Sequence, residues 1–270
     1  MSVETRTRSV LDLVAAKAAG RKLSMLTCYD ALFARLLVEG GVDLLLVGDS
    51  VNQVVAGRES TLSATLDQMI YHAAAVRRGA PQAMVFVDLP FLSYQVSVED
   101  AIRNAGRVMQ ETGANGVKLE GGGPMIPTVR ALVERGIPVM GHLGLVPQSV
   151  HALGGYRVQG REAAAAERIH ADALALQEAG ACAIVLELVP AALAARISAA
   201  LTVPTIGIGA GAGCDGQVLV LQDMLGLNDR FQPKFLRTFA NLAATVREAA
   251  RSYTDEVRAG RYPAPEHEFE

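Results

Sequence analysis

Cysteine is scarce in this 270-residue chain, and its three copies, Cys28, Cys182 and Cys214, lie far apart. An odd number of isolated cysteines does not form a disulfide framework, and the His/Cys spacing of a structural zinc site is absent. Reduced thiols are typical of the cytoplasm, so we predict a soluble cytoplasmic protein.

Long apolar runs and clusters of basic residues are also missing. No run reaches the roughly 18 apolar residues that would cross a bilayer, and the first ten residues, MSVETRTRSV, lack the apolar stretch of a signal peptide. The net charge is −3 and no dense group of lysines and arginines occurs. We therefore expect neither a membrane nor a nucleic acid as partner. Half of the residues are hydrophobic, which is enough for a sizeable core.

Apolar, strand-like runs alternate with helical patterns along most of the chain. The runs span residues 23–28, 42–48, 83–88, 116–120, 138–142, 181–188 and 203–208, with a weaker eighth at 218–221. The helical patterns between them span residues 31–39, 65–78, 97–112, 124–135, 161–179 and 190–200. This alternation predicts an α/β fold with a parallel sheet, most simply a (β/α)8 TIM barrel, with a doubly wound open sheet as the alternative. No linker divides the chain, so we expect one domain over residues 1–270.

Additional helices are expected at both ends of the chain. Residues 9–19 predict a short N-terminal helix. Residues 232–259 carry an apolar stripe at helical spacing, formed by Phe235, Phe239, Leu242, Val246, Ala250, Tyr253 and Val257. This C-terminal helix either closes the barrel or packs on a neighbouring subunit. Both hypotheses stay open, and we expect a homo-oligomer with either.

Acidic residues stand where four of the apolar runs end. They are Asp49, Asp88, Glu120 and Glu187, and His142 ends a fifth run. In a parallel barrel the carboxyl ends of the strands form one face, where functional groups gather. Side chains alternate along a strand, so Lys118 and Glu120 should point the same way. Because Mg2+ takes oxygen ligands and is usually held by one or two carboxylates, we predict a magnesium site at this face.

Each of these residues also has a structural explanation. Asp49 could cap the following helix, and Glu187 could pair with an arginine. Lys118 could neutralise Glu120, and His142 could be a satisfied core histidine. It is the gathering of all of them at one face that favours a catalytic site.

The motifs in this order resemble the ketopantoate hydroxymethyltransferase family. The resemblance rests on TCYD (27–30), VGDS (47–50), DLPF (88–91), VKLEGG (117–122), GHLGLVPQ (141–148), GGYRVQG (154–160), ELVP (187–190), IGIGAG (206–211), DGQVLV (215–220) and PKF (233–235). These segments cover nearly the whole chain, which makes the resemblance highly specific.

The resemblance implies a Mg2+-dependent barrel enzyme of the phosphoenolpyruvate/pyruvate superfamily, assembled as a large homo-oligomer, with a decamer as the candidate size. It would move a one-carbon unit from 5,10-methylenetetrahydrofolate to 3-methyl-2-oxobutanoate through a Mg2+-stabilised enolate, giving 2-dehydropantoate for pantothenate biosynthesis. By motif position, Asp49, Asp88 and Glu120 would be metal ligands and Glu187 the catalytic base. The substrate-binding residues would be Asp49, Ser50, Asp88, Lys118 and His142.

Two other functions remain possible from the sequence. One is a Mg2+-dependent carbon–carbon lyase that acts on an α-keto or 2-hydroxy acid, which would need no one-carbon donor. The other is a barrel that binds or assembles without catalysis. It is disfavoured, because a scaffold has no reason to bring Asp49, Asp88, Glu120 and Glu187 together.

Overall fold

Eight parallel strands form a closed barrel in the computed structural model, which describes residues 9–230 and 232–269. The strands are β1 (Leu23–Thr27), β2 (Leu44–Val47), β3 (Met84–Asp88), β4 (Gly116–Glu120), β5 (Val139–Gly144), β6 (Ala183–Glu187), β7 (Thr205–Ile208) and β8 (Gly216–Leu219). Each strand pairs with the next, and β8 pairs with β1 to close the ring. The (β/α)8 barrel prediction is therefore confirmed, and the open sheet is wrong.

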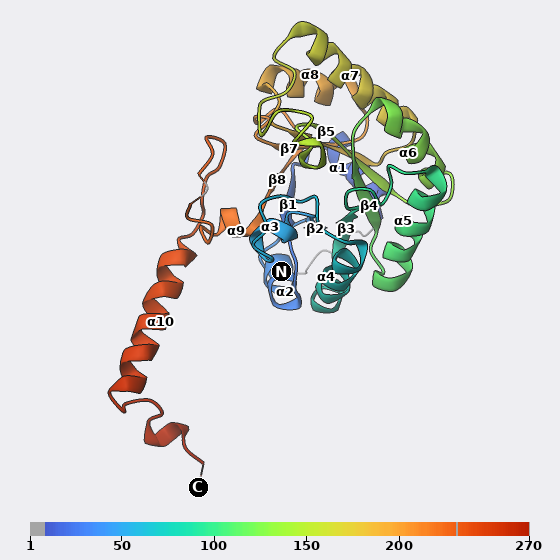
Figure 1. Cartoon of the computed structure of the whole chain (residues 1–270). Coiled ribbons are helices and arrows are strands. Elements are labelled where there is room, and N and C mark those ends of the chain that lie inside the picture. The colour runs from blue at the N-terminus through green and yellow to red at the C-terminus, as the bar shows by residue number, and fades with distance from the viewer. Residues whose placement is uncertain (1–8, 231, 270) are drawn as a thin grey trace. The chain divides into compact units, whose positions relative to one another are not determined.

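Helices follow most strands and surround the barrel in Figure 1. They are α2 (Ala31–Glu39), α3 (Val51–Val54), α4 (Leu66–Gly79), α5 (Val98–Thr112), α6 (Ile126–Val133), α7 (Ala163–Glu178) and α8 (Ala191–Ala200), with short 3-10 turns η1 (Gly123–Met125) and η2 (Pro147–Ser149). Three of the longer helices begin at a side chain that accepts a hydrogen bond from the backbone N–H three residues on, namely Asp30, Thr65 and Ser97. Such N-caps satisfy backbone donors that the helix itself leaves free.

The register of the strands places the polar residues side by side. Asp88 of β3 lies opposite Lys118 of β4, and Glu120 of β4 lies opposite His142 of β5. Gly144 of β5 lies opposite Glu187 of β6. Since parallel strands present their carboxyl ends at one face, this register collects the predicted residues there.

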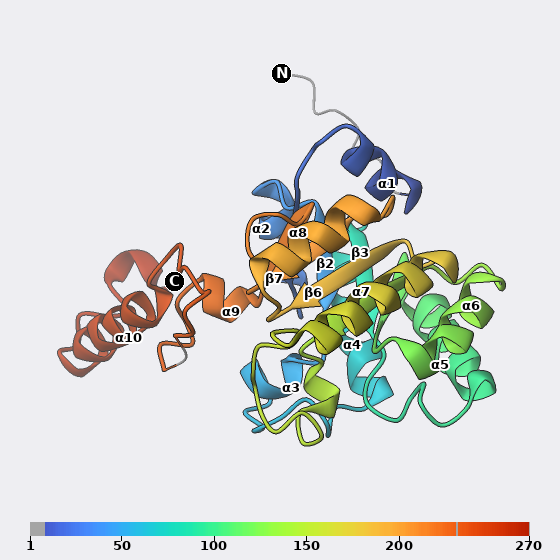
Figure 2. The ribbon, with the colours of Figure 1, turned by 90° about the horizontal axis from the view of Figure 1, so that it is seen from above.

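An N-terminal helix, α1 (Leu11–Ala18), covers the other end of the barrel. Its Leu13 and Ala16 belong to the same buried cluster as the inward-facing residues Met25, Phe86 and Met140. Figure 2 shows α1 at one end of the barrel and α3 at the opposite end. The N-terminal helix prediction is confirmed, and its apolar face seals the end of the barrel that lies away from the carboxylates.

Lys17 fastens α1 to the barrel. Its Nζ atom donates to the carbonyls of Ser198 (2.7 Å) and Val203 (3.0 Å) and pairs with Asp215 at 2.9 Å. Because Lys17→Met would remove a donor from two carbonyls and leave the Asp215 carboxylate with only its bonds from Thr205, we expect the free energy of unfolding to fall by roughly 1–3 kcal/mol. Urea unfolding measures this loss. Arg21→Met, which removes only an exposed pair with Asp43, should lose less, and equal losses would contradict the prediction.

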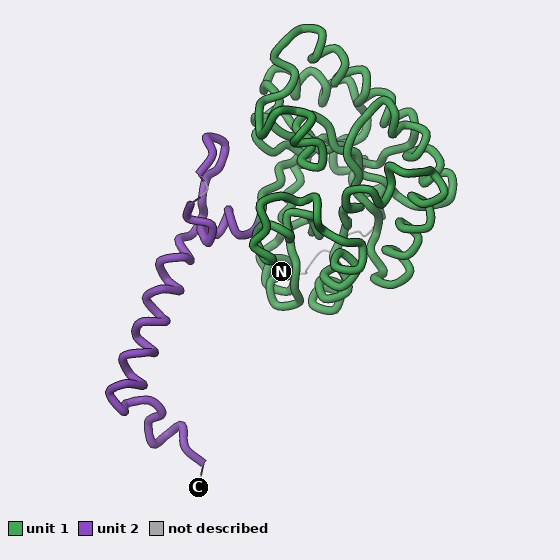
Figure 3. The backbone as a smooth tube through the Cα atoms, viewed as in Figure 1, with its two compact units in different colours: residues 1–220 green, residues 221–270 purple. Residues whose placement is uncertain are grey.

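The chain falls into two compact units, residues Met1–Val220 and Leu221–Glu270 (Figure 3). The first contains the whole barrel. The second contains α9 (Leu221–Met224), α10 (Leu242–Arg258) and the short turn η3 (Pro265–His267). The expectation of a single domain over residues 1–270 stays a prediction.

The C-terminal helix begins ten residues later than the sequence pattern predicts. The structure places its first residue at Leu242 rather than Gln232. Before it, the backbone N–H groups of Phe239 and Leu242 donate to the carbonyls of Met224 and Leu225. These bonds tie the segment to the end of α9 and replace the helical i to i−4 bonds, so Phe235 and Phe239 are not part of the helix.

Large apolar side chains on and near α10 are exposed, among them Phe239, Val246, Tyr253 and Val257. The predicted apolar stripe therefore exists along the later part of this segment.

Within the described residues, no helix combines the length and the apolar character needed to cross a membrane. The first eight residues, which carry most of the N-terminal segment considered above, lie outside the described part.

Candidate active site

The predicted site residues meet at the carboxyl ends of the strands. Asp49 and Ser50 follow β2, Asp88 ends β3, and Lys118 and Glu120 lie on β4. His142 lies on β5 and Glu187 ends β6. Asp49, Asp88, Lys118, Glu120 and His142 are all buried, whereas the Glu187 side chain retains 18% exposure. The structure thus brings together all seven residues that the sequence singled out.

Asp88 joins Asp49 and Lys118. One carboxylate oxygen, Oδ2, accepts a hydrogen bond from the Asp49 backbone N–H at 3.0 Å. The other, Oδ1, lies 3.0 Å from Lys118 Nζ in a buried ion pair. Asp88 therefore fixes the position of the loop that carries Asp49 and supplies the counter-charge of the lysine.

His142 lies between two carboxylates. Its Nε2 atom is 3.2 Å from Glu187 Oε2, and its Nδ1 atom is 3.3 Å from Glu120 Oε1. Nδ1 also lies 3.2 Å from Lys118 Nζ, so Lys118 and Glu120 do point to the same side of β4. Although burial and the Lys118 charge oppose it, the adjacent carboxylates of Glu120 and Glu187 raise the pKa of His142 above its usual value. The ring contacts both carboxylates and so links Glu187 to the rest of the site.

The buried charges do not balance. Burial and repulsion by Asp88 and Glu120 raise the pKa of Asp49 well above its usual range. Burial opposes the charge of Lys118, but the carboxylates of Asp88, Glu120 and Asp49 raise its pKa and keep it protonated. Four carboxyl groups, those of Asp49, Asp88, Glu120 and Glu187, thus share one lysine and one histidine. A site of this kind is short of positive charge, which suits a bound cation.

Glu187 is held by an unusual backbone. The next residue, Leu188, has a φ of 45°, in the left-handed region that is rare for a residue with a side chain. Its N–H donates to the Ile208 carbonyl and its own carbonyl accepts from Gln159 N–H. These two bonds stabilise the strained turn and fix where the Glu187 carboxylate emerges from β6.

Ser50 is oriented by a tyrosine that the sequence did not single out. Its Oγ atom lies 2.8 Å from the hydroxyl of Tyr29, whose backbone carbonyl lies 2.7 Å from His72 Nδ1. Gly48 leaves room for this arrangement. A Cβ atom there would lie 2.9 Å from Ser50 Oγ and 3.6 Å from Asp88 Oδ2.

Sequence reasoning also missed Gln148 and Tyr94, both buried at the same face. Gln148 donates from its side chain to Asp49 and from its backbone to Glu120, at 2.9 Å each. The Tyr94 hydroxyl donates to Gln148 Oε1 at 2.7 Å. Gln148 stands inside the quoted GHLGLVPQ motif, but a loop glutamine has no spacing that reveals such contacts.

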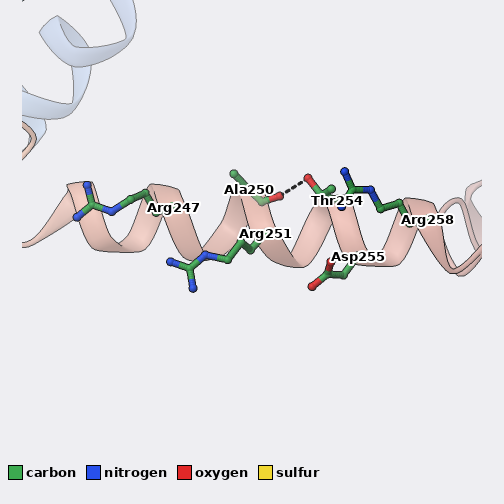
Figure 4. Close-up of a pocket in the computed structure, with 6 residues that line it drawn as sticks. All are labelled: Arg247, Ala250, Arg251, Thr254, Asp255 and Arg258. Carbon is green, nitrogen blue, oxygen red and sulfur yellow. Dashed lines mark hydrogen bonds between the residues drawn. The ribbon is translucent and has the colours of Figure 1, made fainter.

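A hollow of a different character runs along α10 (Figure 4). It is lined by Arg247, Ala250, Arg251, Thr254, Asp255 and Arg258. Its lining carries one carboxylate among three arginines, so it lacks the acid pairs and the buried histidine of the barrel face. We therefore place the candidate active site at the barrel face.

The acidic side chains at the barrel face can serve as ligands for a divalent cation. Within residues 9–230 and 232–269, no group of three or more His, Cys, Asp and Glu side chains is arranged to hold a metal ion by itself. Mg2+, however, usually takes one or two protein carboxylates and completes its shell with water and substrate oxygens. Asp49 and Asp88 meet that requirement, and the excess of buried negative charge favours it.

A closed barrel with buried acids, a lysine and a histidine at its carboxyl face defines an enzyme of the (β/α)8 class. The family model for ketopantoate hydroxymethyltransferase matches residues 7–265. The chain belongs to this family, and it is accordingly a hydroxymethyltransferase. The sequence-based alternatives of a scaffold and of a lyase thereby lose their support.

Relatives named 3-methyl-2-oxobutanoate hydroxymethyltransferase align along almost the whole chain. The protein from Moorella thermoacetica is 58% identical over 257 residues, covering 95% of this chain and 96% of its own. The protein from Desulfotalea psychrophila is 55% identical over 262 residues, covering 97% of this chain and 94% of its own. That from Syntrophus aciditrophicus is 54% identical and covers 100% of both chains.

Solved structures of other enzymes share the fold. A phosphonopyruvate hydrolase complex with oxalate and Mg2+ superposes with a TM-score of 0.63 at 11% identity, covering 98% of this chain and 92% of its own. A 2,3-dimethylmalate lyase of the PEP mutase/isocitrate lyase superfamily has a TM-score of 0.60 at 17% identity. The match covers 97% of this chain and 93% of the lyase chain. At these identities the likeness concerns the barrel alone.

Proposed function

We propose that the protein transfers a hydroxymethyl group from 5,10-methylenetetrahydrofolate to 3-methyl-2-oxobutanoate, forming 2-dehydropantoate for pantothenate biosynthesis. Family membership supports the reaction class. The proposal rests on one observation, namely that the site residues form two separate groups. Asp49, Asp88 and Lys118 form one linked, deeply buried group, and Glu187 stands apart from it across His142. An enzyme that must hold a keto acid and remove a proton from it needs these two separate parts.

The first part holds the keto acid. Lys118 stays protonated beside Asp88 and supplies a positive charge for the substrate carboxylate or for the oxygen that becomes negative. Ser50, oriented by Tyr29, supplies a hydroxyl at the same face. Burial of these groups excludes water and strengthens their interaction with a developing charge.

The second part moves the proton. Glu187 takes the hydrogen from C3 of 3-methyl-2-oxobutanoate, and the electron pair of the broken C–H bond passes to the keto oxygen to give an enolate. C3 then forms a bond to the methylene carbon of the folate, and the two bonds from that carbon to N5 and N10 break. One water molecule supplies the hydroxyl oxygen on the same carbon, and its remaining hydrogen and the C3 proton end on the two folate nitrogens. The buried His142 contacts Glu187, with 3.2 Å between its Nε2 atom and Oε2 of the carboxylate.

Mg2+ is the metal we propose for this site, held by Asp49 and Asp88, with Glu120 acting directly or through water. When bound, the ion would withdraw electron density from the keto acid oxygens and so acidify the C3 hydrogen. The fold is compatible with such a site, since the related-fold phosphonopyruvate hydrolase was solved with oxalate and Mg2+.

For assembly and location we propose a large cytoplasmic homo-oligomer, with a decamer as the candidate size. The exposed apolar side chains of α10, Val246, Tyr253 and Val257, support burial against a second copy of the chain. All three cysteines are free thiols, which suits a reducing compartment.

A three-component assay tests the proposed reaction. We expect 2-dehydropantoate to form only when 3-methyl-2-oxobutanoate, 5,10-methylenetetrahydrofolate and Mg2+ are all present, because the carbon donor and the charge-balancing ion are both required. Product is measured by mass spectrometry, with EDTA and folate-free samples as controls. Turnover of a keto or hydroxy acid without the folate would instead indicate a lyase.

A further inference from the structure

We propose that Gln148 is a positioning residue that sets the separation of the carboxylates at the metal site and holds Asp49 ready to bind a divalent cation. This inference rests on the metal site of the proposed function. It concerns a residue that contacts neither the keto acid nor the folate in that proposal and acts through the acids that it touches.

The side chain of Gln148 uses both ends of its amide. Nε2 donates to Asp49 Oδ2 and to the Leu89 carbonyl, both at 2.9 Å. Oε1 accepts from Tyr94 Oη at 2.7 Å and from Gln95 Nε2 at 3.0 Å. A buried amide that is fully hydrogen-bonded in this way has one orientation, because turning it over would set its NH2 group against two donors.

These contacts connect three strand ends. Asp49 follows β2, Leu89 is the residue directly after Asp88 at the end of β3, and Glu120 ends β4. The Gln148 backbone N–H reaches Glu120 Oε2 at 2.9 Å, so one residue from the loop after β5 contacts two acids and the backbone beside the third. Gln148 thus adds a second link between Asp49 and the end of β3 to the direct bond from the Asp49 N–H to Asp88.

Tyr94 holds Gln148 in place. Its hydroxyl donates to Gln148 Oε1 and accepts from the Glu120 backbone N–H at 3.1 Å. Tyr94 and Gln148 together form a buried polar bridge between β4 and the loop that carries Asp49.

The bridge has a specific effect on Asp49. By donating to Oδ2, Gln148 fixes the plane of a carboxylate that burial and two neighbouring acids destabilise. Without the amide, the Asp49 carboxylate would be free to rotate, and a cation would have to reorganise the site before it could bind.

The test compares Mg2+ affinity in three variants by calorimetry, without substrate or turnover. In Gln148→Met the amide is lost but the length of the side chain is kept. We expect its Mg2+ dissociation constant to rise by about 10- to 100-fold, the usual effect of removing a partner that orients a metal ligand. Tyr94→Phe removes the hydroxyl that donates to Gln148 and accepts from the Glu120 backbone N–H, while Gln148 keeps its own bond to Asp49, so its affinity should fall in the same direction and by less. This second variant preserves the packing if Gln148→Met fails to fold.

Asn52→Leu is the matched control. Asn52 is also a buried amide, but it donates to the Ser60 carbonyl (2.7 Å) and Ser63 Oγ (2.9 Å) and to no carboxylate. It should lower the melting temperature and leave the Mg2+ affinity unchanged. Wild-type affinity in both Gln148→Met and Tyr94→Phe, or an equal loss in Asn52→Leu, overturns the positioning role. Absence of Mg2+ binding in the wild-type protein overturns the proposed metal site itself.

Discussion

Replacement of Glu187 by glutamine is expected to stop hydrogen exchange at C3 of 3-methyl-2-oxobutanoate. A well-placed general base contributes roughly 10²–10⁴-fold to such a step, and an amide does not accept the proton. Glutamine can still accept a hydrogen bond from His142, which lies 3.2 Å away, so the site should keep its shape. The exchange is followed by NMR in D2O with Mg2+ and without folate, which isolates proton removal from carbon transfer.

Two measurements accompany the Glu187→Gln experiment. Keto acid binding, measured by calorimetry, should be retained because Lys118, Asp88 and Ser50 are unchanged. Glu162→Gln, an exposed replacement just before α7, should exchange at the wild-type rate. Exchange at the wild-type rate in Glu187→Gln would mean that another group takes the proton.

The second large effect is expected for Asp88→Asn. Asparagine can still accept from the Asp49 N–H, but it loses the charge that balances Lys118 and that would bind the proposed cation. Since loss of an orienting partner alone lowers metal affinity by 10–100-fold, we expect removal of a ligand to lower it by more than about 100-fold. Breaking a buried ion pair also destabilises a protein by about 3–5 kcal/mol, here moderated by the remaining Asp49 and Glu120 charges. Calorimetry and urea unfolding measure the two effects.

Asp215→Asn separates these effects, because it breaks an Asp–Lys pair at the opposite end of the same barrel. Asp215 pairs with Lys17 at 2.9 Å, just before β8. This variant should lose stability but bind Mg2+ normally. If Asp88→Asn also bound Mg2+ normally, Asp88 would not be a ligand.

The sequence predicts the barrel well because most of its strands, such as β2, β3 and β4, are buried on both faces. Residues 116–120 are predicted as a strand and form β4 with the same bounds, since an apolar run between a glycine and a glycine-rich turn leaves little choice. The eighth strand is less clear. It begins at Gly216, where a Cβ atom would lie 2.5 Å from the Leu23 carbonyl, and this close approach to β1 is a tertiary requirement that local patterning does not contain.

Some residues of the site can likewise be predicted from the sequence, and others cannot. Asp88 and Glu120 are predictable because they end strands, and the parallel topology brings strand ends together. His142 has two interpretations in sequence, and only the fold shows that it lies between Glu120 and Glu187. Gln148 and Tyr94 come from loops whose paths depend on the packing of the whole face. No periodicity identifies such residues, so their place in the site emerges only from the structure.

The helix α1 has a kinetic consequence. Because it seals one end of the barrel, the strand ends that carry the acids face the single remaining end. In the proposed reaction, keto acid, folate, water and products then share one entrance. If the buried Asp88 and Lys118 hold the keto acid, as proposed, we expect it to bind before the folate. We therefore expect a sequential mechanism with ordered binding, because the chain closes the far end of its barrel.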